Sequence, residues 1–308
     1  MTGNQLQESL PGNTLEKHLW NWQGHRIQYA ITPKRLHGET PGTCKPLILI
    51  HGFGASIGHW QKNIPVFAEA GYQVFALDLL GFGGSEKAPI NYTTEIWVEL
   101  LKDFWSEHIQ EPAVFIGNSI GGLLSLMILA HHSEISDGAI LINCAGGLSH
   151  RPQELNPVVR FVMGSFNKLV SNPITGKFVF NNIRRKSQIR RTLYQVYRDR
   201  SAVTDELVDM LYEPSCEPGA QQVFASILTA PPGPSPSELL PKIKQPILVI
   251  WGADDPWTPI TGANIYQDAA TNGKNIKVVP IPGAGHCPHD EAPKVVNAEI
   301  IKWLGERD

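Results

Sequence analysis

The 308-residue sequence is poor in charge, in cysteine and in long apolar runs, and each shortage excludes a class of protein. Charged residues make up 18% of the chain, below the roughly 25% of an average globular protein. Hydrophobic residues make up 42%, and a long disordered chain would show the opposite balance. The formal net charge of −3 at pH 7 also lacks the basic excess of a nucleic-acid-binding protein, so we expect no nucleic-acid partner.

Cysteine usage and hydropathy predict the environment of the protein. The four cysteines lie far apart and form no C-x-x-C pair, which favours free thiols in a reducing compartment over a disulfide framework. No basic segment followed by an apolar one opens the chain, so no secretory signal is visible. The longest apolar stretches, such as 123–130, are far shorter than the roughly 20 residues that span a bilayer. We expect a cytoplasmic protein, with peripheral contact to a membrane left open.

Six short apolar segments, each with turn residues around it, predict the strands of a parallel sheet. Their hydrophobicity is continuous, as in strands that helices bury on both faces. Amphipathic or apolar stretches at 94–109, 120–131 and 293–304 predict helices between strands. This alternation indicates an α/β fold. The predicted strands are 47–50, 74–77, 114–116, 139–142, 247–250 and 276–281.

The alternation stops between residues 148 and 237, which we call the cap segment. It shows helical patterns rich in Arg, Phe and Tyr and ends in the proline-rich run 231–236, which cannot be helical. Eleven basic residues stand against seven acidic ones, so the segment carries +4 and the rest of the chain −7. We predict a core of residues 15–147 and 238–308 with a helical cap inserted at 148–237.

The strongest local signal for chemistry is Gly117-Asn118-Ser119-Ile120-Gly121. It follows one predicted strand and opens a predicted helix, which is the context of a G-x-S-x-G nucleophile elbow. A serine on such a strained turn needs small neighbours, because a side chain at Gly117 or Gly121 would collide with the packed helix and strand. The helix N-terminus also favours negative charge that develops at the serine. We predict that Ser119 is a nucleophile.

A serine hydroxyl needs a base, and that base needs a partner. His286 follows the last predicted strand and a tight turn, so we expect it to be the base; His289 is expected to have a structural or substrate-edge role. For the partner, Asp254 and Asp255 compete directly after strand 247–250. The spacing G-x-x-D-x-x-x-P favours Asp255, which leaves Asp254 as a solvated or capping neighbour. The chain order Ser…Asp…His is that of α/β-hydrolases.

The segment His51-Gly52-Phe53-Gly54 follows strand 47–50 and fits an oxyanion hole. Its glycines let the backbone turn so that the N–H of Phe53 faces the nucleophile, while the N–H of Ile120 supplies the second donor. We expect the His51 side chain to be structural. Two such donors stabilise a tetrahedral oxyanion by several kcal/mol, typically about 3–4 kcal/mol for one donor.

Together with the run D-L-L-G-F-G-G-S at 78–85, these motifs resemble the α/β-hydrolase superfamily over nearly the whole chain, from about 20 to 304. The resemblance implies a mostly parallel central sheet flanked by helices, with an inserted helical cap. It also implies a catalytic triad of Ser119, Asp255 and His286, with Phe53 and Ile120 as oxyanion donors. The implied reaction is hydrolysis of a carboxylic ester through an acyl-enzyme, with no cofactor and no metal.

A narrower resemblance is to the pheophytinase and chlorophyll dephytylase branch of plants and cyanobacteria. It rests on Asp255-Pro256-Trp257, the segment 284–291, the G-N-S elbow and the cap run 190–197. It implies a lipid-like substrate, a phytyl ester of a large tetrapyrrole, and a protein peripheral to the thylakoid membrane. The residues expected to contact the substrate are Gly52, Trp257, Phe161 and Phe224.

Two features of the cap segment leave alternatives open. Its apolar residues either line a phytol-sized groove or form the core of the cap. Its basic residues at 184–186, 190 and 191 are either a solvated helix face or a contact for anionic lipid headgroups. The apolar residues concerned are Phe161, Met163, Phe166, Phe178, Phe180 and Phe224.

Other functions share parts of this pattern. A serine at the nucleophile position disfavours haloalkane dehalogenases and epoxide hydrolases, which use aspartate. Carbon–carbon bond hydrolases of ring-cleavage products also carry a G-N-S elbow and remain an alternative, as does a ligand receptor with little turnover. The histidines, cysteine and acids at 286–291 lack the helical H-x-x-x-H pair or the distant matched set of a metal site.

Overall fold

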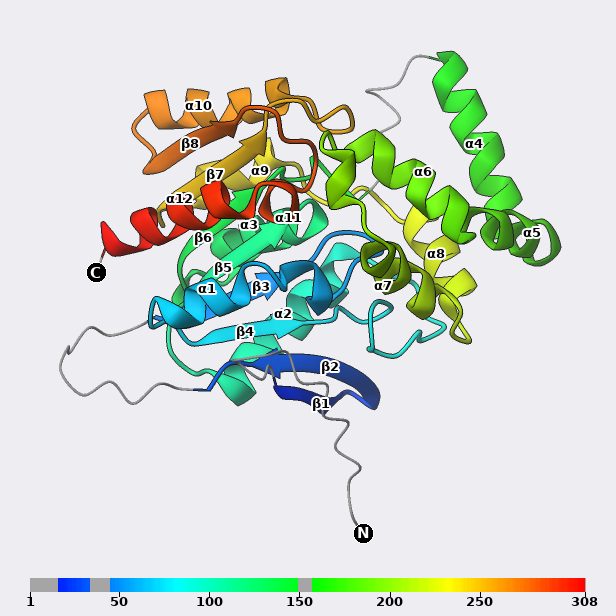
Figure 1. The fold of residues 1–308 in the computed structure, drawn as a ribbon, viewed down its shortest axis with the longest axis horizontal. Helices are drawn as coiled ribbons and strands as arrows, with labels where there is room; N and C mark the ends of the chain where they lie inside the picture. Colours follow the sequence, from blue (N-terminus) through cyan, green and yellow to red (C-terminus); the bar gives the residue numbers. More distant parts are fainter. Residues whose placement is uncertain (1–15, 34–44, 149–156, 308) are drawn as a thin grey trace, which may run out of the picture.

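The computed structural model describes residues 16–33, 45–148 and 157–307, with the backbone alone for residues 157–163 and 173. An eight-stranded sheet crosses the molecule in the order β1-β2-β4-β3-β5-β6-β7-β8 (Figure 1). The pairs β1/β2 and β2/β4 are antiparallel, and every other neighbouring pair is parallel. This arrangement confirms the α/β fold class. The strands are β1 Glu16–Trp22, β2 His25–Ile31, β3 Leu47–Ile50, β4 Val74–Leu77, β5 Ala113–Asn118, β6 Ser136–Ile142, β7 Ile247–Gly252 and β8 Ile276–Ile281.

The central strands are buried at every position because helices cover both faces of the sheet (Figure 1). In β3, Ile48 and Ile50 pack toward one layer of helices, and Leu47 and Leu49 toward the other. The first layer consists of α2 Thr94–His108, α3 Ile120–His131, α9 Pro236–Leu239 and α10 Asn264–Thr271. The second consists of α1 Ile64–Glu69 and α12 Pro293–Gly305. All six strands predicted from continuous hydrophobicity are present.

The sequence analysis missed the hairpin β1–β2 at the edge of the sheet. Its turn, Gln23-Gly24, has positive φ at both positions (50° and 87°), as a tight two-residue hairpin turn requires. Trp20 and Trp22 are buried at alternate positions of β1, and their indole N–H groups donate to carboxylates of α2. The sequence signal for this hairpin was the alternation of apolar and polar residues beside a Gln-Gly turn.

The cap segment leaves the sheet after β6 and returns before β7. Its helices group at one end of the sheet, on the right in Figure 1. The Leu148 N–H donates to the Pro232 carbonyl (2.8 Å), which brings the two ends of the insertion together. The helices are α4 Pro157–Ser171, α5 Pro173–Ile183, α6 Lys186–Val196, α7 Asp205–Ser215 and α8 Ala220–Thr229. Nowhere in the described ranges is a helix both long and apolar enough to cross a membrane.

Glycines allow α3 to pack closely against the sheet. Adding one methyl group at such a position should therefore strongly lower the stability of the protein. A Cβ at Gly121 would collide with the carbonyl of Ile50, so we expect Gly121→Ala to lower the free energy of unfolding by about 2–4 kcal/mol. The matched control is Gly164→Ala in α4, where a Cβ meets open space. That change should be neutral or stabilise by up to about 1 kcal/mol. Urea unfolding of both variants tests the contrast, and equal losses would contradict it.

Candidate active site

Ser119 lies on a strained turn between β5 and α3. Its φ of 54° and ψ of −115° fall outside the regions that L-residues favour, a cost of order 1–3 kcal/mol that surrounding packing must offset. Gly117 and Gly121 make this possible, because a Cβ at Gly117 would meet the backbone of Gly121. This bears out the expectation that the elbow needs small neighbours. The side chain of Ser119 lines a cavity.

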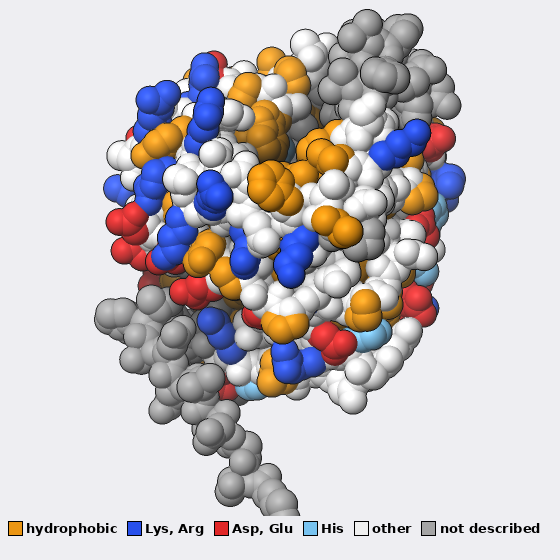
Figure 2. All heavy atoms as spheres, turned by 90° about the vertical axis from the view of Figure 1, so that its right-hand side faces the viewer, with side chains coloured by type: hydrophobic (Ala, Val, Ile, Leu, Met, Phe, Trp, Pro, Cys, Tyr) orange, Lys and Arg blue, Asp and Glu red, His pale blue; other side chains and the backbone are white. Residues whose placement is uncertain are grey.

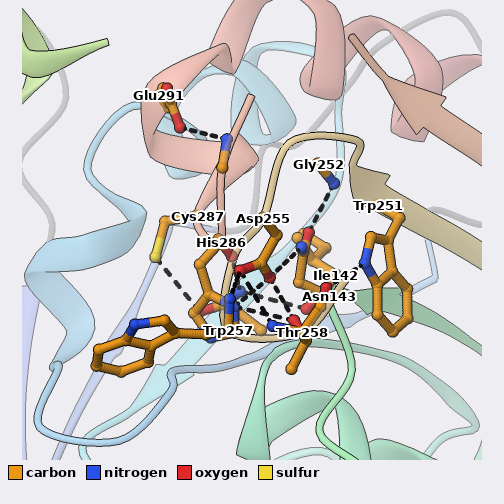
Figure 3. A network of polar contacts seen from close by, with 12 residues as sticks. Ile142, Asn143, Trp251, Gly252, Asp255, Trp257, Thr258, His286, Cys287 and Glu291 are labelled. Carbon is orange, nitrogen blue, oxygen red and sulfur yellow. Dashed lines mark hydrogen bonds and ion pairs between the residues drawn. The ribbon is translucent and has the colours of Figure 1, made fainter. Parts of the chain in front are cut away.

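His286 and Asp255 form a hydrogen-bonded pair in the loops after β8 and β7 (Figure 3). His286 Nδ1 lies 2.6 Å from Asp255 Oδ2. A carboxylate only accepts, so Nδ1 carries the proton and Nε2 keeps a free lone pair. His286 lines the same cavity as Ser119. The structure thus brings Ser119, His286 and Asp255 to one edge of the sheet, with the imidazole in the tautomer of a general base.

Asp255 is buried, and four donors besides His286 bind its carboxylate. The N–H groups of Trp257 (2.8 Å) and Thr258 (3.1 Å) donate to Oδ1. The Thr258 hydroxyl and the Asn143 amide (2.8 Å) donate to Oδ2 beside the imidazole. Burial by itself raises the pKa of Asp255. The bond and charge of His286, with Thr258 and the Trp257 N–H, outweigh burial and lower the pKa to about 2.

Asp254 occupies a different place from Asp255. It is exposed, and its Oδ2 accepts from the Gly283 N–H (2.9 Å), so it fastens the turn that precedes His286. The sequence analysis missed Asn143, which bridges Asp255 and the Gly252 N–H (2.9 Å). Asn143 directly follows the buried strand β6. A polar residue at the carboxyl end of a parallel strand was the signal for it.

The expected oxyanion donors lie on two adjacent turns. The Ala55 N–H donates to the Gly52 carbonyl (3.3 Å), which closes a turn with Gly54 at φ 71°. A Cβ at Gly52 would lie 3.3 Å from the Ser119 Cβ, so this turn abuts the elbow. Ile120 opens α3, where the first N–H groups have no intrahelical acceptor. His51 is buried, and its Nε2 accepts from the Leu79 N–H (3.0 Å), which is a structural contact.

A cavity of about 490 Å³ separates Ser119 and His286 from the cap segment. Of the expected substrate contacts, Gly52, Trp257 and Phe224 line it, and the side chain of Phe161 lies outside the described residues. Phe180 also lines it and packs against Phe224 with ring centroids 5.3 Å apart. This size and lining are typical of ligand pockets.

The expectation for the apolar cap residues was wrong in part. Phe166 and Phe178 do not line the cavity. They do not form a core either, because they are 39% and 79% exposed. Both lie on helix faces that point away from the core of the cap. The side chain of Met163, like that of Phe161, lies outside the described residues.

The comparisons with known proteins agree with this geometry. Residues 45–293 match the model of the α/β-hydrolase fold family. The chain belongs to the α/β-hydrolase family. Chloroplast pheophytinase of Arabidopsis thaliana is 29% identical over 88% of this chain, which spans 64% of that protein's length. The 2-hydroxy-6-oxo-6-(2'-aminophenyl)hexa-2,4-dienoic acid hydrolase of Metapseudomonas resinovorans is 26% identical over 86% of each chain.

Solved structures show the same fold. A meta-cleavage product hydrolase of Pseudomonas fluorescens IP01 superposes with a TM-score of 0.73 and 23% identity, covering 94% of this chain and 98% of the other. At this identity the likeness extends to the fold alone. The α/β-hydrolase scaffold is therefore established.

The cap segment of this α/β-hydrolase is joined to the core through a buried polar network. Tyr197, at the end of α6, donates to Asp290 Oδ2 (2.8 Å), and His59 Nε2 lies 2.8 Å from the same hydroxyl. Lys62 pairs with the other carboxylate oxygen of Asp290 (2.8 Å). His289 is also buried, and its ring contacts His59 and Trp60. It does not line the cavity, so its role is structural.

Replacing each of the two neighbouring aspartates by asparagine tests which one pairs with His286. An asparagine at position 255 carries no negative charge to pair with the imidazole N–H. We therefore expect Asp255→Asn to lower kcat/KM for an activated ester by about 10³–10⁴. Asp254→Asn, the matched control, should change it by less than about threefold. Steady-state kinetics on folded samples decides between them; a larger loss in Asp254→Asn would assign the pairing to Asp254.

The buried network predicts loss of stability in acid. Burial lowers the pKa of His59 to about 4, although Asp290 acts in the opposite direction, whereas an unfolded histidine titrates near 6.5. The unfolded chain therefore binds more protons between these values, and about 3 kcal/mol is lost as the pH falls from 6.5 to 4. Urea unfolding at pH 7.5 and 4.5 measures this loss. His59→Gln should reduce it, and an unchanged pH dependence in that variant would refute the assignment.

Proposed function

We propose that this α/β-hydrolase is a serine esterase that cleaves carboxylic esters with a long apolar chain. One observation carries the proposal. Ser119 stands on a strained elbow in the same apolar cavity as His286, whose imidazole is held by an ionised Asp255. Nucleophile, base and orienting acid are the three parts that acyl transfer through an acyl-enzyme requires.

In the proposed reaction His286 Nε2 takes the hydroxyl proton of Ser119 as Oγ attacks the ester carbonyl carbon. The N–H groups of Phe53 and Ile120 stabilise the oxyanion. The tetrahedral intermediate collapses, the C–O bond breaks, and His286 gives its proton to the leaving alcohol. Water then attacks the acyl-enzyme with the same base, which releases the acid and restores Ser119.

The lining of the cavity supports an apolar substrate. Phe53, Phe180 and Phe224 form a chain of ring contacts with Phe82 along one wall. Such a wall stabilises a buried hydrocarbon chain by about 25 cal/mol per Å² of apolar surface. The similarity to a pheophytinase makes a phytyl ester of a chlorophyll-type pigment our specific proposal, at the periphery of a thylakoid membrane.

A carbon–carbon bond hydrolase is the second candidate. Relatives that act on ring-cleavage products cover most of this chain, and Arg184 lines the cavity. In the described part of the chain the Arg184 side chain donates only to neutral groups, Asn181 Oδ1 and the Ser215 carbonyl. A guanidinium without a carboxylate partner suits the acidic group of a dienoate substrate.

A panel of three substrates separates the candidates: a short-chain nitrophenyl ester, pheophytin and a ring-cleavage dienoate. We expect the wild type to hydrolyse the nitrophenyl ester and pheophytin, with release of phytol. Ser119→Ala should lose at least about 10⁴ in kcat and unfold at the same urea concentration. A fluorophosphonate probe should label the wild type but not this variant.

Each other result has a distinct meaning. Turnover of the nitrophenyl ester alone would support the esterase proposal and reject the pigment as the substrate. Turnover of the dienoate alone supports the carbon–carbon hydrolase. A labelled Ser119 with no turnover of any substrate would reject the enzymatic proposal in favour of a ligand receptor, and full activity in Ser119→Ala would reject Ser119 as the nucleophile.

A further inference from the structure

The charge of the cap segment is concentrated in one acid-free stretch. From Leu155 to Arg198 the sequence contains no Asp or Glu and nine basic residues. Helices α4, α5 and α6 all lie in this stretch. Such a stretch repels cations and attracts anionic partners at short range.

The same stretch exposes four large apolar side chains that lie close together in the sequence. Phe166, Leu169, Ile174 and Phe178 are 39%, 43%, 83% and 79% exposed. They fall within thirteen consecutive residues on α4 and α5, although exposed apolar residues elsewhere in the described chain are scattered. Contiguous exposed apolar side chains mark interaction sites, whereas isolated ones carry no such meaning.

The spacing on α5 gives this helix two different faces. Ile174, Lys177 and Phe178 follow the i, i+3, i+4 pattern of a single helix face and are all exposed. Phe180 and Ile183, on the other side, line the cavity. Helix α5 therefore separates the substrate cavity from a solvent-facing apolar strip.

Two basic residues of α4 and α5 accompany this strip and have no acidic partner among the described residues. Lys168 and Lys177 are exposed, and neither forms an ion pair within the described residues. On α6 the situation differs, because Lys186 pairs with Asp209 (2.5 Å) and Arg190 with Asp205 of α7. Part of the basic run at 184–191 is thus neutralised, whereas Lys168 and Lys177 of α4 and α5 keep their full charge among the described residues. Figure 2 shows this end of the molecule, where orange and blue side chains intermingle and red ones lie toward the margins.

We propose that one surface, formed by Phe166, Lys168, Leu169, Ile174, Lys177 and Phe178, docks on an anionic lipid bilayer. The lysines would meet acidic headgroups, and Ile174 and Phe178, the two most exposed of the apolar residues, would enter the acyl boundary. An exposed apolar strip accompanied by two lysines and by no acidic residue of its own segment fits a lipid interface better than a protein groove. Docking would place the cavity wall one helix diameter, about 10 Å, from the lipid. The proposal is independent of the reaction.

Sedimentation of the full chain with phosphatidylcholine vesicles that contain 0–40% phosphatidylglycerol tests the docking. We expect binding to rise with the anionic fraction and to fall in 0.5 M salt. Lys168→Gln/Lys177→Gln should weaken partitioning about 30-fold, and Ile174→Ser/Phe178→Ser by at least about tenfold. Hydrolysis of a soluble ester, where present, and urea unfolding should match the wild type in both.

Matched controls come from elements outside the cap segment. Leu19 and Val295 are 64% and 52% exposed on β1 and α12, and Leu19→Ser/Val295→Ser should partition like the wild type. Lys294→Gln/Lys302→Gln removes the same charge from α12 and should also have little effect. Absence of binding at 40% anionic lipid would overturn the proposal and point to an acidic protein partner. Equal losses in test and control variants would overturn it as well.

Discussion

The candidate site depends on how the backbone of His286 is held. Its N–H donates to the carbonyl of Val196 at the end of α6 (2.9 Å), and its carbonyl accepts from the Asn118 amide beside Ser119 (3.1 Å). One peptide segment is thus fixed by the cap on one side and by the nucleophile elbow on the other. Glycines allow this approach, because a Cβ at Gly285 would collide with the Val196 carbonyl and one at Gly252 with the Gly285 carbonyl. The position of His286 therefore depends on the cap segment as much as on the sheet.

This coupling divides the cap into two parts with different physical roles. The end of α6 is tied to the core by Val196, by Tyr197 and by Glu291, which accepts the N–H groups of Arg198 and Asp199. Displacing it would leave buried polar groups without partners, at about 1–3 kcal/mol each. Helices α4 and α5 pack mainly on each other and on α8 and display their apolar strip to solvent. One insertion can thus hold His286 in place and also present an exposed outer surface, because different helices supply the two parts.

Sequence reasoning reached the sheet and the serine because both leave local signatures. Continuous apolar runs predict strands buried on both faces. Five consecutive residues around Ser119 are enough to predict the elbow. The hairpin β1–β2 was missed because one face of it is exposed and its apolar residues alternate. Asn143 was missed because its role depends on Asp255, which approaches it from the loop after β7, more than a hundred residues later in the sequence. The exposure of Phe166 and Phe178 could not be read from composition, since an aromatic residue on a helix is compatible with core, cavity or surface until the neighbouring helices are placed.

The cavity's chemistry also bears on which substrate the serine meets. Lys87 lines it, but its ammonium is occupied by the Gly83 and Ser85 carbonyls and by Glu217 of the cap segment (3.0 Å). This cation therefore joins core to cap and is not free to receive a substrate carboxylate. Placing an unpaired carboxylate against the remaining aromatic wall would cost several kcal/mol, whereas a hydrocarbon chain is favoured there. Only an acid whose carboxylate reaches Arg184 avoids that cost. Adding or removing one methylene changes binding to such apolar walls by only about 1–3 kcal/mol, so in the proposed esterase we expect the polar part of the ester to contribute to selectivity as well.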